Sequence, residues 1–317
     1  MGDKKSPESR ASRLEELLIK TSRTFALSIP LLPEPTRREV TVAYLLFRVA
    51  DTLEDATSWE PAQQVEELNR LAALLTRPTS QGSRDLAQRW IEDPPLPNAS
   101  YRELLSELTA VVDALQELPA ASRELVRADT LRTIERMTSF VQRVRGSRTL
   151  QLASVSELQD YCYAVAGIVG EMLTELFLIG SPRLESIAPA LRAGAGKFGE
   201  ALQLVNILKD SAADAGEGRE YLPPGVELRT VFELARSDLD TAGTYVLDLQ
   251  RAGAPRGVVA FTALPVLLAW RTLDRVERHG PGAKLTRDEV ATIAGSLQND
   301  LDHDRPAVPS GRPVGRT

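Results

Sequence analysis

Apolar residues recur three to four positions apart along almost the whole chain. This spacing places apolar side chains on one face of an α-helix. Alternating runs of β-branched residues between turn residues, which would predict strands, are almost absent. The pattern predicts an all-α protein, with helices at 13–29, 36–56, 60–76, 83–92, 100–117, 121–145, 156–180, 183–212, 226–253, 255–279 and 286–301.

The expected helices are separated by short proline-containing breaks, such as those at Pro30, Pro33 and Pro35. No break has the composition of a long linker between two folded halves. We therefore expect one folded catalytic domain over residues 13–302. Residues 1–12 and 303–317 have little apolar surface to bury, so we expect both segments to be disordered.

Composition narrows the class of protein. The 317 residues are 43% hydrophobic and 26% charged, as is usual for a soluble globular protein. A net charge of -6 and the lack of a basic stripe argue against a nucleic-acid partner. The first residues lack the apolar run of a secretory signal, and the single cysteine fits a reducing compartment. We expect a cytoplasmic protein.

No transmembrane segment is predicted. The apolar stretch 258–270 is shorter than the roughly 20 residues that cross a bilayer. The stretch 161–180 is long enough, but Glu171 and Glu175 lie inside it, and carboxylates are costly at membrane depth. Peripheral contact with a membrane surface remains an open alternative.

An acidic motif follows the apolar residues 40–47. Asp51 and Asp55 stand four residues apart, so their carboxylates project side by side from a helix. Like charges near the C-terminal end of a helix are unfavourable, both through mutual repulsion and through the helix dipole. We therefore expect a cation to offset this cost.

A second acidic motif, Asp210 and Asp214, has the same spacing after another apolar helix. Asn206 and Gln203 lie one and two turns earlier on roughly the same face. Carboxylates from two facing helices suit Mg²⁺, which usually binds one or two carboxylates together with substrate phosphates. We expect the two motifs to hold a diphosphate through bridging metal ions.

Each acidic motif taken alone also fits an ordinary solvated helix face, which is the commoner situation for such spacing. The occurrence of both motifs favours a functional pair. Each follows an apolar helix, and each has a neighbouring basic residue, Arg48 or Lys209.

Four ordered motifs, from about residue 22 to about residue 291, resemble the squalene and phytoene synthase family. They are Ser22-Arg23-Thr24-Phe25; Tyr44 and Arg48 with Asp51-Thr52-Leu53-Glu54-Asp55; Tyr161-Cys162-Tyr163-Ala164-Val165-Ala166-Gly167-Ile168-Val169-Gly170; and Gln203, Asn206, Lys209, Asp210 and Asp214 with Gly218-Arg219-Glu220-Tyr221-Leu222-Pro223. Lys209 departs from the arginine that relatives often have, which keeps the charge but loses the bidentate fork.

The resemblance implies the isoprenoid-synthase helical fold with a central apolar cavity, in which small residues such as Gly167 and Gly170 allow close approach. It also implies a prenyltransferase that joins two prenyl diphosphates head to head through a cyclopropylcarbinyl diphosphate. Farnesyl diphosphate is the leading substrate, and the C20 homologue is the alternative. The implied Mg²⁺ ligands are Asp51, Glu54, Asp55, Asp210 and Asp214; the substrate-binding residues are Ser22, Arg23, Arg48, Gln203, Asn206, Lys209 and Arg219; the catalytic candidates are Tyr161, Tyr44 and Phe25.

The last step decides the product. Reduction by NADPH gives squalene, whereas proton loss gives dehydrosqualene or phytoene, and release after the first step makes a presqualene diphosphate synthase. Residues 261–270, Lys284 and Arg287 resemble squalene synthases more than phytoene synthases, so we expect NADPH with its 2′-phosphate near these two cations. They also fit a solvated helix start. A catalytically inactive assembly relative should have lost its aspartates, and both motifs are intact.

Three other features are expected to be structural. Gly194, Gly196 and Gly199 match the dinucleotide fingerprint, but they fall inside a helical run without a βαβ unit, which favours helix packing. Cys162 lacks a neighbouring base, so we expect a buried small residue. His279 and His303 are expected to be exposed.

Overall fold

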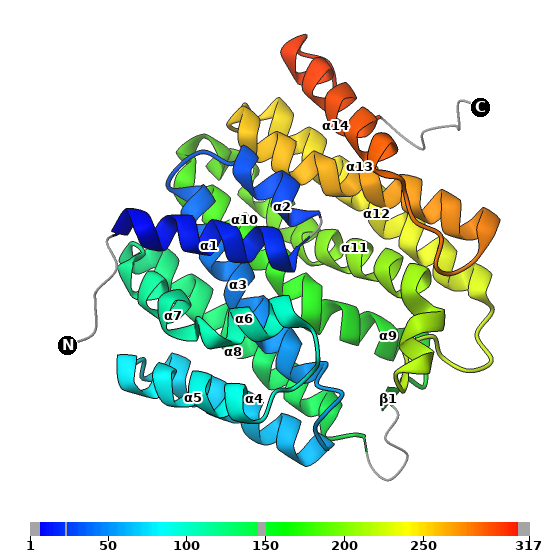
Figure 1. Cartoon of the computed structure of the whole chain (residues 1–317). Helices are drawn as coiled ribbons and strands as arrows, with labels where there is room; N and C mark the ends of the chain where they lie inside the picture. The colour runs from blue at the N-terminus through cyan, green and yellow to red at the C-terminus, as the bar shows by residue number, and fades with distance from the viewer. Residues whose placement is uncertain (1–6, 23, 145–149, 310–317) are drawn as a thin grey trace. The chain divides into compact units, whose positions relative to one another are not determined.

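The computed structural model describes residues 7–22, 24–144 and 150–309. Its elements are α1 (Pro7–Thr21), α2 (Phe25–Ser28), α3 (Thr36–Glu54), α4 (Pro61–Thr76), α5 (Ser80–Glu92), α6 (Ala99–Ser106), α7 (Leu108–Glu117), α8 (Ala120–Val141), β1 (Leu150–Gln151), α9 (Val155–Cys162), α10 (Ile168–Gly180), α11 (Ala188–Gly216), β2 (Arg219–Glu220), α12 (Leu228–Arg251), α13 (Arg256–His279) and α14 (Arg287–Asp302). The all-α prediction is confirmed (Figure 1).

Two compact units make up the chain, and each is described by itself. Unit 1 comprises residues 1–29 and 34–145, and unit 2 comprises residues 30–33 and 146–317. The expectation of one catalytic domain over 13–302 remains a prediction.

Helix α3 is the central helix of unit 1, because it packs against α1, α4, α6, α7 and α8. Its apolar residues Leu45, Leu46 and Val49 are fully buried. Apolar spacing of this kind gives the helix a wide core-facing side. Asp51 and Asp55 stand at the C-terminal end of this helix, as the sequence predicted.

Helix α11 is the central helix of unit 2, where it packs against α10, α12 and α13. Figure 1 shows α12 and α13 running side by side in the same unit. Small residues allow close packing on α11: a Cβ added to Gly170 of α10 would lie 2.1 Å from the carbonyl oxygen of Ala195. The backbones of the two helices therefore touch, as predicted for this run of small residues.

A π-helical turn, Tyr163–Gly167, interrupts the helix predicted at 156–180. It separates α9 from α10, and the N–H of Ile168 donates to the carbonyl of Tyr163. π-Helical turns are rare and occur often at functional sites. The turn coincides with the signature residues that carry the family resemblance.

Both chain ends differ from the expected boundaries. Helix α1 begins at Pro7, six residues before the predicted start, and ends at Thr21, so that α2 is a separate short helix. Residues 303–309, which we expected in a disordered tail, are held against α12: Gln250 bonds to the backbone of Arg305 and Ala307, both at 2.8 Å. Val308 is 1% exposed. Burial of this apolar side chain holds the segment in place, which its proline-rich composition did not indicate. Residues 1–6 and 310–317 lie outside the described residues.

Two helical stretches, Val155–Gly180 and Arg256–His279, are long and apolar enough to cross a membrane. Most of each apolar window is buried inside the protein, as in the core helices of soluble proteins. Length and apolar composition alone are therefore weak evidence for a membrane span.

Candidate active site

The first acidic motif ends α3. The helix finishes at Glu54, and the N–H of Asp55 donates to the carbonyl of Asp51 at 2.9 Å. Asp51 and Asp55 are partly exposed, whereas Glu54 is 8% exposed. The two aspartates are thus accessible to a ligand, while Glu54 has a different, largely buried environment.

Arg48 is the cation that accompanies this motif. Its Nη1 lies 2.6 Å from Oδ2 of Asp51, and its Nε donates to the hydroxyl of Tyr44 at 3.3 Å. Burial works to lower the pKa of Arg48, but Asp51, Tyr44 and Tyr101 outweigh it, so that this pKa lies above its ordinary value. Arg48 therefore offsets part of the repulsion between the carboxylates.

The segment after α1 lies next to Arg48 through Tyr44. The Tyr44 hydroxyl donates to the carbonyl of Thr21 at 2.8 Å, and the Tyr44 ring packs on Phe25 with centroids 5.6 Å apart. Ser22 Oγ accepts a hydrogen bond from the N–H of Phe25 at 2.9 Å. These contacts link Ser22, Phe25, Tyr44, Arg48 and Asp51. Arg23 lies outside the described residues.

The second acidic motif occupies the last turns of α11. Lys209 Nζ lies 3.1 Å from Oδ2 of Asp210 and donates to Oδ1 of Asn206 at 3.2 Å. Gln203, two turns earlier than Asp210, is half-buried, and Asn206 is exposed. The predicted polar stripe is therefore present on α11, with the lysine paired to the first aspartate.

A sharp turn brings Arg219 back to the end of α11. Gly218 has φ +79°, a left-handed conformation that glycine adopts without strain. Arg219 then lies 3.6 Å from Asp214 and 2.5 Å from Glu217, measured from Nη2 to the carboxylate oxygens. Burial raises the pKa of Asp214 despite Arg219, and Asp210 and Glu217 add to the rise. The cluster therefore has excess negative charge that a cation would stabilise.

Tyr161 stacks on Tyr221 in the interior of unit 2. Their ring centroids are 4.6 Å apart, and the Tyr161 hydroxyl donates to that of Tyr221 at 3.0 Å. The two rings are 3% and 7% exposed. Tyr221 lies two residues after Arg219 in the motif Gly218-Arg219-Glu220-Tyr221-Leu222-Pro223, and this position was the signal in the sequence that could have assigned it a role.

The predicted cofactor residues lie in and after the loop that joins α13 to α14. Lys284 and Arg287 are exposed. The N–H of Gly282 donates to the carbonyl of Lys209 at 2.7 Å, so the loop is attached to the second acidic motif. This hydrogen bond holds the loop before α14 against the end of α11, although the two segments are distant in the sequence.

A buried polar cluster was missed by sequence analysis. Lys197 Nζ lies 2.6 Å from Glu200 and 3.7 Å from Asp238, whose carboxylates are both buried. Burial raises the pKa of Asp238 to about 6, with Lys197 opposing and Glu200 adding to the rise. Cys162 is buried nearby, and burial raises the pKa of its thiol, as expected for an unreactive cysteine.

The other structural expectations are also met. Gly194, Gly196 and Gly199 lie inside α11, which excludes the strand-to-helix turn of a dinucleotide site. His279 and His303 are exposed.

The metal ligands that each acidic motif could offer are the oxygen atoms of its carboxylates. Within residues 7–22, 24–144 and 150–309, no group of three or more His, Cys, Asp or Glu side chains is arranged to hold a metal ion. Two carboxylates with excess negative charge still fit Mg²⁺, because this ion keeps several waters and takes further oxygens from substrate phosphates. The residues present therefore suit a metal that binds together with a diphosphate.

Comparison with known proteins identifies relatives of this chain. Residues 18–226 match the family model described as squalene/phytoene synthase. Squalene synthase from Eremothecium gossypii is 28% identical over 245 residues, covering 74% of this chain and 52% of the relative; that from Ganoderma lucidum is 28% identical over 326 residues, covering 92% and 67%. The match to several such relatives thus spans about half of their length.

Structural comparison gives the same fold. The complex of TcSQS with the ligand E5700 superimposes with a TM-score of 0.73 at 23% identity, covering 96% of this chain and 94% of that one. Since the family model covers well over half of the chain, the protein belongs to the squalene/phytoene synthase family.

Proposed function

We propose that the protein is a Mg²⁺-dependent prenyltransferase that joins two molecules of farnesyl diphosphate head to head and reduces the product to squalene with NADPH. The observation that carries the proposal is the pairing of each acidic motif with its own cation, Arg48 beside Asp51 and Lys209 beside Asp210. Such carboxylate and cation sets suit a diphosphate bound with metal ions. Family membership supports the reaction class.

In this proposal the acidic residues hold the metal and the basic residues hold the phosphates. Asp51, Asp55, Asp210 and Asp214 are the ligands, and Glu54 contributes from its buried position. When bound, Mg²⁺ supplies Lewis-acid stabilisation of the leaving diphosphate. Arg48, Lys209 and Arg219 pair with the phosphate oxygens, and Ser22, Arg23, Gln203 and Asn206 complete the polar contacts.

The aromatic residues act on the carbon skeleton. Loss of diphosphate leaves an allylic cation, which the double bond of the second chain attacks to give presqualene diphosphate with release of a proton. Tyr161 is the proposed group for this proton and for stabilising the cation, since its ring is buried and its hydroxyl is held by Tyr221. Tyr44 and Phe25 are secondary candidates. Apolar helices around a central cavity would exclude water from the cations.

NADPH would bind through Lys284 and Arg287. Both side chains are exposed, and neither has an ion pair within the described part of the chain, so their charges are available to a 2′-phosphate. The hydrogen bond from Gly282 to Lys209 holds this loop beside the second acidic motif. Hydride from the cofactor would then quench the final cation.

The proposal is tested by incubating the purified full chain with farnesyl or geranylgeranyl diphosphate and Mg²⁺, with and without NADPH, and identifying the products by mass spectrometry. Squalene formed only with NADPH supports it. If dehydrosqualene or phytoene forms whether or not NADPH is present, the result supports the condensation and contradicts the reductive step. Presqualene diphosphate as the sole product would limit the enzyme to the first step, and no turnover would favour an inactive relative.

A further inference from the structure

The guanidinium of Arg48 lies over two aromatic rings that come from different helices. Its Cζ is 5.6 Å from the centroid of Tyr44 on α3 and 5.7 Å from that of Tyr101 on α6. Both distances are within the range in which a ring attracts a cation. Tyr101 belongs to none of the motifs that the sequence analysis used, because it is distant from Arg48 in the sequence.

Tyr101 meets Arg48 through its ring. Its hydroxyl has no hydrogen-bond partner among the residues that the structure describes, and the side chain is half-buried. Arg48 in turn donates through Nε to Tyr44 and through Nη1 to Asp51, and within the same described residues Nη2 has no acceptor. One edge of the guanidinium is therefore available for a phosphate oxygen while the rest is fixed.

The backbone of Tyr101 is itself fixed at the start of α6. Asn98 Oδ1 accepts hydrogen bonds from the N–H groups of Ser100 at 3.0 Å and Tyr101 at 3.2 Å. A side-chain cap of this kind stabilises the first turn of a helix. The cap therefore fixes the backbone from which the Tyr101 ring extends.

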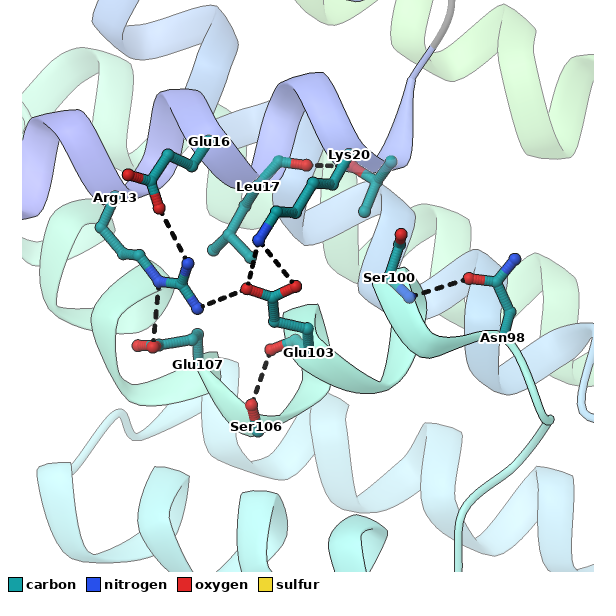
Figure 2. Close-up of polar contacts among 10 residues, drawn as sticks. Arg13, Glu16, Leu17, Lys20, Asn98, Ser100, Glu103, Ser106 and Glu107 are labelled. Carbon is teal, nitrogen blue, oxygen red and sulfur yellow. Dashed lines mark hydrogen bonds and ion pairs between the residues drawn. The ribbon is translucent and has the colours of Figure 1, made fainter.

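Helix α6 is also fastened to α1, as Figure 2 shows. Glu103 accepts from Lys20 Nζ at 2.7 Å and lies 2.8 Å from Arg13 Nη2, while Arg13 Nε donates to Glu107 at 3.0 Å. Hydrogen bonds from Lys20 and Arg13 lower the pKa of Glu103, so it stays charged at neutral pH. This network joins the helix that carries Tyr101 to the helix whose Thr21 carbonyl accepts from Tyr44.

We infer that Tyr101 is a positioning residue for diphosphate binding, which holds Arg48 in place through the face of its ring. The inference rests on the proposed function, because it takes Arg48 as a phosphate-binding residue. It adds a residue from α6 to the group that determines affinity for the substrate. Tyr101 acts through Arg48, so removing its ring should have no effect once Arg48 is absent.

A double-mutant cycle tests this directly. KM for farnesyl diphosphate and kcat are measured at saturating Mg²⁺ for the wild type, Y101L, Y101F, R48A and Y101L/R48A, with melting temperatures as the control for folding. Y101L should raise KM by about three- to tenfold with little change in kcat. Y101F keeps the ring and should bring KM back towards the wild-type value. The double variant should match R48A.

The inference is overturned if Y101L leaves KM unchanged, if Y101F is as impaired as Y101L, or if Y101L worsens R48A by its full separate factor. Calorimetric titration with magnesium pyrophosphate separates this question from the proposed function, since it needs no turnover. If the wild type converts no prenyl diphosphate, the proposed function fails. Weaker pyrophosphate binding by Y101L, restored in Y101F, would still support the role of Tyr101, and equal binding or no binding by the wild type would contradict it.

Discussion

Gly199 of α11 lies directly against the carbonyl of Ala166 in the π-helical turn. A Cβ added to Gly199 would stand 2.0 Å from the carbonyl oxygen and 2.5 Å from the carbonyl carbon of Ala166. Backbone atoms cannot move aside as the end of a flexible side chain can. Helix α11, which carries the second acidic motif, is therefore in direct backbone contact with the π-helical turn Tyr163–Gly167.

Replacing Gly199 by Ala should destabilise the protein by on the order of 3 kcal/mol, because the methyl group forces two backbones apart. The matched control is Gly295→Ala, also inside a helix, where an added Cβ has nothing within 4 Å. This control should be stabilising, by about 1 kcal/mol or less. Urea unfolding measures both, and equal stabilities for the two variants would contradict the close contact.

Asp51→Asn and Asp210→Asn should each abolish turnover while the fold persists. Each variant removes one carboxylate charge from its metal-binding pair and one partly exposed ion pair, with Arg48 or Lys209, worth about 1 kcal/mol or less. Melting temperature should hold, or rise if carboxylate repulsion dominates. Asp240→Asn, on the exposed side of α12, is the activity control. Near-normal activity of either variant at saturating Mg²⁺ would refute the metal-site assignment.

How far the sequence predicted this site depends on the distance between interacting residues. The pairs Asp51 with Asp55 and Asp210 with Asp214 stand one helical turn apart, so periodicity alone placed them on the correct helices. The contacts of Arg48 with Tyr101, of Tyr161 with Tyr221 and of Gly282 with Lys209 join distant parts of the chain, and no local pattern predicts them.

Helix positions were predicted well because apolar spacing is a strong local signal, while the ends were less certain. The start of α1 at Pro7 and the order of residues 303–309 depend on tertiary contacts, such as that between Gln250 and Ala307. The buried charge of Asp238 was also missed, since its partners Lys197 and Glu200 belong to another helix.

Asp238 should make stability depend on pH. Its pKa is about 6 in the folded protein against 3.8 for an ordinary aspartate, so the folded state binds the proton more tightly. The contribution of Asp238 to stability is therefore fully present below the unfolded pKa and is lost as pH rises through the window from about 4 to about 6, by on the order of 1–3 kcal/mol. Lys197, Glu200 and Cys162 are the titratable groups that face it.

Asp238→Asn should flatten this part of the stability profile and cost little at pH 7.5, because Asn carries no buried charge. Urea unfolding between pH 4.5 and 7.5 measures the slope. The exposed Asp240→Asn on the same helix should leave the profile as it is in the wild type. A slope in Asp238→Asn equal to that of the wild type would show that Asp238 is not responsible.

Replacing both Lys284 and Arg287 by Ala should raise KM for NADPH far more than KM for farnesyl diphosphate. The proposed contacts are charge-assisted hydrogen bonds to a 2′-phosphate, worth about 1.5–3 kcal/mol each, or roughly tenfold or more in affinity. Arg229→Ala, a highly exposed cation elsewhere in unit 2, is the control. NADH lacks the 2′-phosphate, so the double substitution should change KM for NADH little. If KM rises equally for NADPH and NADH, Lys284 and Arg287 do not bind the 2′-phosphate.

The most direct test of head-to-head condensation is a time course with the purified full chain, farnesyl diphosphate and Mg²⁺, followed by mass spectrometry. Without NADPH, presqualene diphosphate or other non-reduced C30 products should accumulate, and addition of NADPH should then yield squalene. Omitting Mg²⁺ with a chelator present should stop both stages. If the protein forms neither a C30 product from farnesyl diphosphate nor a C40 product from geranylgeranyl diphosphate, it does not condense prenyl diphosphates head to head.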